Sequence, residues 1–328
     1  MTDLNALCSG VLSGNRRSIA QSITLSESTL STDQELSRKL LDKLQSKSGR
    51  AVRLGISGIP GVGKSTFIEN FGIYLLRQNP DLKIGVLAVD PSSPLRGGSL
   101  LGDKTRMEEL SSHPRAFIRP SPGGGDTGGV SRRCRESIQI LDAAGYDLIF
   151  VETIGVGQAE YQVASMVDLF LMLQMPGTGD EIQGMKKGAL ELADLIIIHK
   201  ADGDLKLAAQ KTKQQQLFAM DLSSSHDDHS APVLLISSTE KLGFESLKDN
   251  IDQVITRKKK SNEFELKRSR QKKQWFEQEI KYQLIERIRQ RPDFEKIYQS
   301  HLNMVVDSKA YVGQSVSELL SHLDINKP

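Results

Sequence analysis

The sequence predicts an α/β protein in which a mostly parallel central sheet is flanked by helices and extended by helical regions at both ends. Three observations predict this class. Strand-length segments alternate with helical segments from about residue 51 to 256, these strand segments are apolar throughout, and several are followed directly by a polar or charged residue. Strands that are apolar on both faces are typical of a parallel sheet covered by helices on both sides. The expected strands cover residues 53–57, 83–89, 116–119, 148–151, 169–173, 195–198 and 233–236.

Residues 1–50 are expected to form an N-terminal helical region. Four leucines recur there at helical spacing, and one of two hydroxyl residues before them could cap the helix. These residues are Leu36, Leu40, Leu41 and Leu44, with Ser31 or Thr32 as the cap. We expect this region to pack as a helical lid on the sheet domain, which spans residues 51–256.

The stretch from Gly58 to Ser65 organises the expected sheet domain. It reads Gly-Ile-Pro-Gly-Val-Gly-Lys-Ser and fits the phosphate-binding pattern G-x-x-x-x-G-K-[ST], with a strand expected before it and a helix over 66–76 after it. The glycines let main-chain N–H groups turn toward an anion, and the N-terminus of the helix adds partial positive charge. Lys64 can reach the outer phosphates, and the Ser65 hydroxyl can bind Mg²⁺. The sequence therefore predicts a P-loop NTPase.

Acidic residues near strand ends are candidates for a metal site. Glu152 directly follows an apolar strand, where a carboxylate can hold Mg²⁺ through water, and Asp90 follows another strand. Asp103 is a further candidate, although a plain surface-charge role stays open for it. Gly155 can give its N–H to a γ-phosphate, so that this loop is ordered only when the phosphate is present.

The segment His199-Lys200-Ala201-Asp202, at the end of an apolar strand, indicates which base is bound. A carboxylate at Asp202 can accept hydrogen bonds from N1–H and the N2 amino group of guanine, whereas adenine offers no donor pair on that edge. The stem of Lys200 would pack over the ring. The usual motif is Asn-Lys-x-Asp, and here His199 replaces Asn. Imidazole can donate a hydrogen bond as Asn does, but its reach differs, so guanine selection is expected and its strength stays open.

Composition argues against several classes of protein. The formal net charge is +2, which gives no global field of the kind that attracts nucleic acid, and no apolar run approaches the length of a transmembrane helix. Cys8 and Cys134 share no metal or redox spacing, and the N-terminal residues lack a signal-peptide pattern. We therefore expect a cytoplasmic protein without nucleic-acid or membrane partners, and an organelle stays open if the source is eukaryotic.

Residues 257–328 are expected to form a C-terminal helical arm. Residues 257–273 carry nine Lys or Arg against two Glu. Such a basic run could contact RNA or anionic lipid, but it is more often the solvated face of a helix, and no RNA-binding motif accompanies it. An apolar stripe then recurs every four residues and is expected to be buried, either in the chain's own core or against a second subunit. Its members are Phe276, Ile280, Leu284 and Ile288.

Five longer segments carry a family resemblance. They are residues 58–66, Val-Asp-Pro-Ser-Ser-Pro at 89–94, residues 97–107, residues 151–160 and Pro-Gly-Thr-Gly-Asp at 176–180. In these segments the chain resembles the ArgK/MeaB family, the methylmalonyl-CoA mutase-associated GTPases. The resemblance is close over roughly residues 50–250. It implies a Mg²⁺-dependent GTPase, with GTP and GDP as ligands, that gates cofactor loading of an adenosylcobalamin-dependent mutase and protects it. It also implies a homodimer joined through the C-terminal arms.

The resemblance implies roles for individual residues as well. The residues implied in catalysis are Lys64, Asp103 and Glu152, and those implied in metal binding are Ser65, Asp90, Asp103 and Glu152. The residues implied in nucleotide binding are Gly58, Ile59, Pro60, Gly61, Val62, Gly63, Lys64, Ser65, Thr66, Gly155, Lys200, Asp202, Ser237, Ser238 and Thr239. The segment 180–187 is similar to an extra nucleotide-sensing switch. Two residues depart from the family pattern, His199 in place of Asn and Ser238 in place of Ala, and both concern base recognition.

Two other functions stay open at this point. One is a P-loop ATPase or kinase of a basic amino acid transport system. The absence of an acceptor-binding segment and the guanine preference expected from Asp202 speak against it. The other is an insertion GTPase for a different metal-cofactor enzyme, which the sequence does not exclude.

Overall fold

A computed structural model describes residues 3–89, 107–120, 127–153, 158–177, 190–223 and 231–322. The chain divides into two compact units, Met1–Gln271 and Lys272–Pro328. The division into 1–50, 51–256 and 257–328 that the sequence suggests stays a prediction. The compact-unit boundary falls 15 residues after residue 256, and the contacts of the basic segment described below account for this shift.

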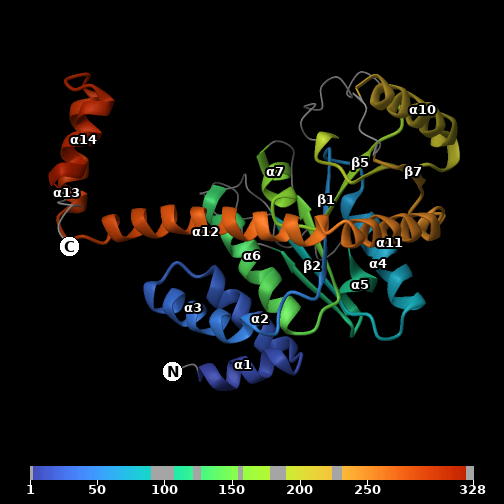
Figure 1. Ribbon diagram of the computed structural model, residues 1–328, viewed down its shortest axis with the longest axis horizontal. Coiled ribbons are helices and arrows are strands. Elements are labelled where there is room, and N and C mark those ends of the chain that lie inside the picture. Colours follow the sequence, from blue (N-terminus) through green and yellow to red (C-terminus); the bar gives the residue numbers. More distant parts are fainter. Residues whose placement is uncertain are drawn as a thin grey trace. The chain divides into compact units, whose positions relative to one another are not determined.

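The first unit is built on a seven-stranded sheet in the order β3-β2-β4-β1-β5-β6-β7 (Figure 1). Every neighbouring pair of strands is parallel. The expected α/β class is therefore confirmed, and each of the seven expected strands is present within one or two residues of its predicted bounds. The strands are β1 Val52–Gly58, β2 Ile84–Val89, β3 Ala116–Pro120, β4 Leu148–Thr153, β5 Leu169–Gln174, β6 Leu195–His199 and β7 Val233–Ile236.

Helices cover both faces of the sheet, as the apolar strands predict (Figure 1). Alternate side chains of a strand enter different cores: Phe150 of β4 packs with one helix layer, whereas Ile149 and Val151 pack with the other. One layer consists of α4 Lys64–Gln78, α5 Glu108–Ser112 and α11 Phe244–Lys260. The other consists of α1 Leu4–Leu12, α2 Arg16–Glu27, α3 Ser31–Gln45, α6 Thr127–Ala143 and α7 Gln158–Ala164. A third cluster joins α10 Lys206–Ser223 to β6 and β7.

The N-terminal helices pack on the sheet domain, as expected, but the predicted helix cap is wrong. Helix α3 already includes Ser31, and its N-cap residue is Leu30, which has no capping side chain. Ser28 directs the chain into the helix instead, because its hydroxyl accepts from the Leu30 N–H and donates to Asp33 at 2.7 Å.

Helix α2 is also bonded to the edge strand β3. The Arg16 guanidinium donates to the carbonyl oxygen of Ala116 at 2.6 Å. At the other end of the same strand, Arg119 forms a close ion pair with Glu27. The side chain of Glu27 is 8% exposed, so this pair lies largely out of solvent. The two contacts fix the N-terminal helices along the outer side of the sheet.

The basic segment after Arg257 is not simply a solvated helix face, which corrects the simplest interpretation of its sequence. Lys258 forms an ion pair with Asp194 at 2.6 Å, and Arg268 forms one with Asp168 at 2.7 Å. Both acids lie directly before apolar strands, Asp168 before β5 and Asp194 before β6. The first turns of α12 Glu263–Arg289 are thereby bonded to the sheet, and this is why the first compact unit extends to Gln271.

Asp168 is the centre of this attachment. Its carboxylate accepts from the main-chain N–H and the guanidinium of Arg53 in β1 and twice from the guanidinium of Arg268 in α12. The Arg268 guanidinium also donates to the carbonyls of Gly49 and Ala51 and lies 4.5 Å from the ring centroid of Phe264. Burial alone would raise the pKa of Asp168, but the hydrogen bonds and charges of Arg268 and Arg53 outweigh it and lower the pKa to about 2.

The second unit contains the rest of α12 and a helical hairpin of α13 Phe294–Val306 and α14 Val312–His322. In the hairpin, the buried residues His301 and Ser315 are hydrogen-bonded at 3.0 Å. The predicted apolar stripe lies on α12 and is largely exposed, with Phe276 at 69% and Leu284 at 52%. None of the helices in the described ranges combines the length and apolar character needed to cross a membrane.

Candidate functional site

The phosphate loop lies between the end of β1 and the start of α4, as its sequence predicts. Gly61 and Gly63 have φ values of 81° and 94°, in the left-handed region that glycine adopts without strain. Gly63 is the N-cap residue of α4 and provides no capping side chain, so the positive end of the helix dipole faces the loop. The Lys64 ammonium lies against the same loop, where it donates to the carbonyls of Gly58 at 2.8 Å and Ile59 at 3.4 Å. The loop therefore gathers positive charge in the way that a phosphate chain requires.

Two oxygen-bearing residues meet beside the loop. Glu152 near the end of β4 pairs in register with Ile56 of β1, which brings its carboxylate to the start of α4. The Ser65 hydroxyl donates to this carboxylate at 3.0 Å, and both residues are buried. Thr153, the residue after Glu152 in β4, donates from its hydroxyl to that of Ser57 in β1 at 3.0 Å. A carboxylate next to a hydroxyl is the kind of oxygen donor set that Mg²⁺ binds, directly or through water.

The predicted base-binding segments also come together. Asp202 follows β6, and its carboxylate accepts hydrogen bonds from Ser237, at close distance, and from Thr239 at 2.7 Å. These two hydrogen bonds are the main reason why the pKa of Asp202 is lowered. Lys200 has a φ of 59°, unusual for a residue with a side chain, and its ammonium donates to Gly61 at 2.8 Å. The strained residue is thus held to the phosphate loop, and Asp202 is kept ionised and oriented.

His199 lies between the two halves of the site and is 2% exposed. Its Nδ1 is 2.7 Å from the carbonyl oxygen of Val62, and its Nε2 is 2.7 Å from the hydroxyl of Ser238. Because a carbonyl oxygen only accepts, Nδ1 carries the proton and Nε2 accepts from Ser238. Burial is the main cause of the lowered pKa of His199, and the positive charge of Lys200 adds to it, whereas the hydrogen bond to Val62 and the charge of Asp202 oppose it.

Some predicted residues cannot be placed. Asp90, Asp103 and Gly155 lie outside the described residues, and so does the segment 180–187. Their roles stay predictions. Within the described ranges, no group of three or more His, Cys, Asp or Glu residues is close enough to hold a metal ion. Of the residues predicted to bind metal, Ser65 and Glu152 are the two that lie within the described ranges.

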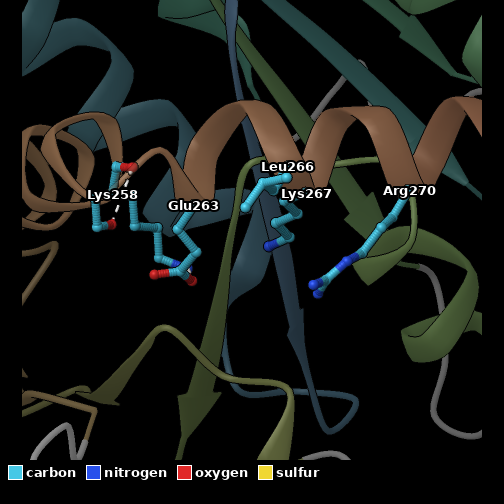
Figure 2. Close-up of a pocket in the computed structure, with 6 residues that line it drawn as sticks. Lys258, Glu263, Leu266, Lys267 and Arg270 are labelled. Carbon is cyan, nitrogen blue, oxygen red and sulfur yellow. Dashed lines mark hydrogen bonds and ion pairs between the residues drawn. The ribbon is translucent and has the colours of Figure 1, made fainter.

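A hollow of about 420 Å³ lies elsewhere, next to the junction of α11 and α12 (Figure 2). It is lined by Lys258, Ser261, Glu263, Leu266, Lys267 and Arg270. Its lysines Lys258 and Lys267 form ion pairs with Asp194, which directly precedes β6. The hollow therefore lies near the N-terminal ends of the strands, whereas the phosphate loop lies at their C-terminal ends. Lys258 is paired with Asp194 at 2.6 Å and with Glu263 at 3.0 Å. Burial lowers the pKa of Lys267, although the charge of Asp194 opposes this.

Sequence reasoning missed two sets of contacts, one beside the phosphate loop and one at the opposite end of the strands. Neither the Ser57–Thr153 pair nor the bonds of Arg53, Asp168 and Arg268 were foreseen. One signal was available: Asp168 directly precedes the fully buried strand β5, at the opposite end of the strands from the phosphate loop. An acidic residue in that position is too far from the predicted nucleotide site to act there. If it is buried, cations from elsewhere in the chain must pair with it.

The fold and the site together define a P-loop nucleotide-binding protein of the α/β class. The sequence model of the family described as "Methylmalonyl Co-A mutase-associated GTPase MeaB" matches residues 19–293. The chain is 42% identical to the GTPase ArgK of Escherichia coli over 290 residues, which is 88% of this chain and 87% of that protein. It is 41% identical to the mitochondrial methylmalonic aciduria type A homolog of Mus musculus over 300 residues, which is 88% of this chain and 72% of that protein.

A solved structure is similar over nearly the whole chain. It is the crystal structure of a LAO/AO transport system kinase, with 33% sequence identity and a TM-score of 0.74, and the match covers 98% of this chain and 99% of that one. These findings show the family. The chain belongs to the MeaB family of methylmalonyl-CoA mutase-associated GTPases, and it is a GTPase.

Proposed function

We propose that this GTPase is Mg²⁺-dependent and acts as a chaperone for an adenosylcobalamin-dependent acyl-CoA mutase, in the first place methylmalonyl-CoA mutase. In this proposal it gates the loading of the mutase cofactor according to the nucleotide it holds and protects the mutase from inactivation. The observation that carries the nucleotide part is the pair of hydroxyls, from Ser237 and Thr239, that orients Asp202 next to the phosphate loop. The family match and the name of the mouse relative support the mutase part.

Guanine selection is assigned to Asp202. We expect Asp202→Asn to raise the Kd for GDP by about 10- to 100-fold while changing the Kd for ADP little, because an amide donor then faces the donors of guanine. Calorimetry with GDP and ADP measures both constants. Asp204→Asn, two residues away in the 3-10 turn Gly203–Leu205, is the matched control and should bind GDP like the parent. Equal affinity of the parent protein for GDP and ADP would refute guanine selection and favour the transport-system kinase that the similar crystal structure represents.

The metal and hydrolysis residues are assigned on the same basis. Ser65 and Glu152 would hold Mg²⁺, with Asp90 and Asp103 as the further acids that the family motifs imply. Bound Mg²⁺ would neutralise phosphate charge. Lys64 would stabilise the charge that develops on the outer phosphates, and Gly155 would contact the γ-phosphate. The 3.0 Å contact between Ser65 and Glu152 supports this assignment, since it gathers hard oxygen donors at the end of the loop.

The mutase is expected to bind one nucleotide state better than the other. By linkage, a partner that prefers the GTP form must in turn change nucleotide affinity, and coupling of this kind is typically about 5- to 150-fold. We expect slow GTP turnover alone and faster turnover with purified methylmalonyl-CoA mutase. Turnover, together with binding assays in GDP and in a non-hydrolysable GTP analogue, tests this, and ADP with the matching ATP analogue provides the control. If the mutase binds in no nucleotide state, the client is a different metal-cofactor enzyme.

We also propose a homodimer joined through the C-terminal arm and a cytoplasmic location. The exposure of Phe276, Ile280 and Leu284 on α12 supports the dimer, because an apolar stripe of this kind is normally covered. The location is supported by Cys8 and Cys134, which are both free thiols.

A further inference from the structure

We infer that His199 and Ser238 act together as one positioning pair that joins the phosphate loop to the base-binding loop, and that His199 does not itself read the base. The inference rests on the proposed guanine site. It starts from the two departures from the family pattern that the sequence shows at separate places. The structure brings these two residues into direct contact, with His199 Nε2 and Ser238 Oγ 2.7 Å apart.

The ring of His199 has no capacity left for a base. One nitrogen donates to Val62 of the phosphate loop, the other accepts from Ser238, and the residue is almost completely buried. A neutral imidazole offers one donor and one acceptor, so both are used within the protein. The discrimination of guanine then rests on Asp202 alone among the residues of this segment.

The ring is fixed by packing as well as by hydrogen bonds. A Cβ atom at Gly63 would lie 2.9 Å from two ring atoms, which shows how closely the main chain of the phosphate loop passes over the imidazole. On another side the ring meets Phe67 of α4 edge-on, with centroids 5.9 Å apart. The His199 ring is therefore packed directly against the phosphate loop, and the position of the ring helps to set the position of the loop.

Ser238 supplies the second half of the pair. It lies between Ser237 and Thr239, the two residues whose hydroxyls orient the carboxylate of Asp202. Three successive hydroxyls thus attach one short loop to both His199 and Asp202. Loss of the Ser238 hydroxyl would leave a buried imidazole nitrogen without its donor, and replacement of the ring by an amide would leave the buried Ser238 hydroxyl without the nitrogen that accepts from it. The family pattern of Asn and Ala avoids both problems, because an amide can donate to Val62 and leaves no ring nitrogen that needs a hydroxyl.

A double-mutant cycle tests the pair. We expect His199→Asn and Ser238→Ala each to raise the Kd for GDP about 5- to 150-fold, whereas the double variant should return to within about threefold of the parent. The GDP-over-ADP preference should persist in all three, since Asp202 is intact. Ser246→Ala, at an exposed serine of α11, is the control and should bind like the parent. The inference would be overturned if the increase in the Kd for GDP of the double variant equalled the product of the two single increases. It would also be overturned if Ser238→Ala bound GDP like the parent.

A second measurement needs no variant. The ¹⁵N chemical shifts of the His199 ring in the parent protein report its tautomer, and we expect the Nδ1–H form. The Nε2–H form would contradict the pair even if a variant failed to fold. The outcomes separate the two proposals: a parent that does not prefer GDP to ADP refutes the guanine site, whereas a GDP-selective parent with multiplying losses refutes the pair alone.

Discussion

Lys64→Ala is expected to reduce GTP hydrolysis by at least about 10²- to 10³-fold. The lysine ammonium already lies inside the phosphate loop, 2.8 Å from the carbonyl of Gly58, where it would face the outer phosphates. Its removal takes a fixed positive charge from a buried position at which negative charge increases during the reaction. Water cannot replace this charge, because it would have to reorganise as the reaction proceeds.

The measurement is single-turnover release of inorganic phosphate, with the Kd for GDP determined in parallel. Lys211→Ala, at an exposed position on α10, is the matched control and should hydrolyse GTP like the parent. Turnover of Lys64→Ala within about tenfold of the parent would mean that the loop does not act on the outer phosphates, and the catalytic assignment would have to be withdrawn.

Asp168→Asn is expected to destabilise the protein by about 3–5 kcal/mol, since it leaves the guanidinium groups of Arg53 and Arg268 together with no carboxylate between them. The side chain of Asp168 is 1% exposed, so water cannot take the place of the lost charge. At about 2–4 °C per kcal/mol for a domain of this size, the thermal midpoint falls by about 6–20 °C. Asp252→Asn, which removes one partner of the exposed Lys248–Asp252 pair, is the control and should cost less than about 0.5 kcal/mol.

The contribution of Asp168 to the free energy of unfolding should decrease as the pH falls. Its pKa is about 2 in the folded protein, against an ordinary value of 3.8. A carboxyl whose pKa is lowered by folding contributes stability above its unfolded pKa and loses it as the pH falls toward the folded pKa. The contribution, about 2 kcal/mol, is therefore complete above pH 4 and disappears toward pH 2. Urea unfolding at several pH values should show the gap between parent and Asp168→Asn narrowing below pH 4. A constant gap would exclude this carboxylate as its source.

The sequence predicts the sheet well because its central strands β4, β5 and β6 are fully buried, and each strand can be recognised within its own four to seven residues. The phosphate loop is equally local, since its function depends on eight consecutive residues. The C-terminal ends of β4 and β6 could also be assigned to the candidate site, because the C-terminal ends of all strands in a parallel sheet lie on the same side.

Contacts between distant residues could not be predicted in the same way. Arg268 and Asp168 are 100 positions apart, and nothing in the basic segment distinguishes a lysine that pairs with Asp194 from one that faces water. The exchanges at positions 199 and 238 were both visible in the sequence, but only the fold shows that one side chain donates to the other. Contacts of the same kind, between the basic segment and the acids that precede β5 and β6, are the reason why the first compact unit extends to Gln271.

The attachment of α2 to β3 has a consequence for how the protein avoids self-association. β3 is an edge strand, and in a parallel pair alternate residues turn their main-chain groups away from the neighbouring strand. The Ile84 N–H of β2 donates to Arg115, so the carbonyl of Ala116 points outward, where the edge strand of another molecule could pair with it. The Arg16 guanidinium donates a hydrogen bond to that carbonyl, and the Glu27–Arg119 ion pair holds α2 against the same strand. The N-terminal helices thus cover part of the open edge of the sheet, and less of that edge is available to pair with a strand of another molecule.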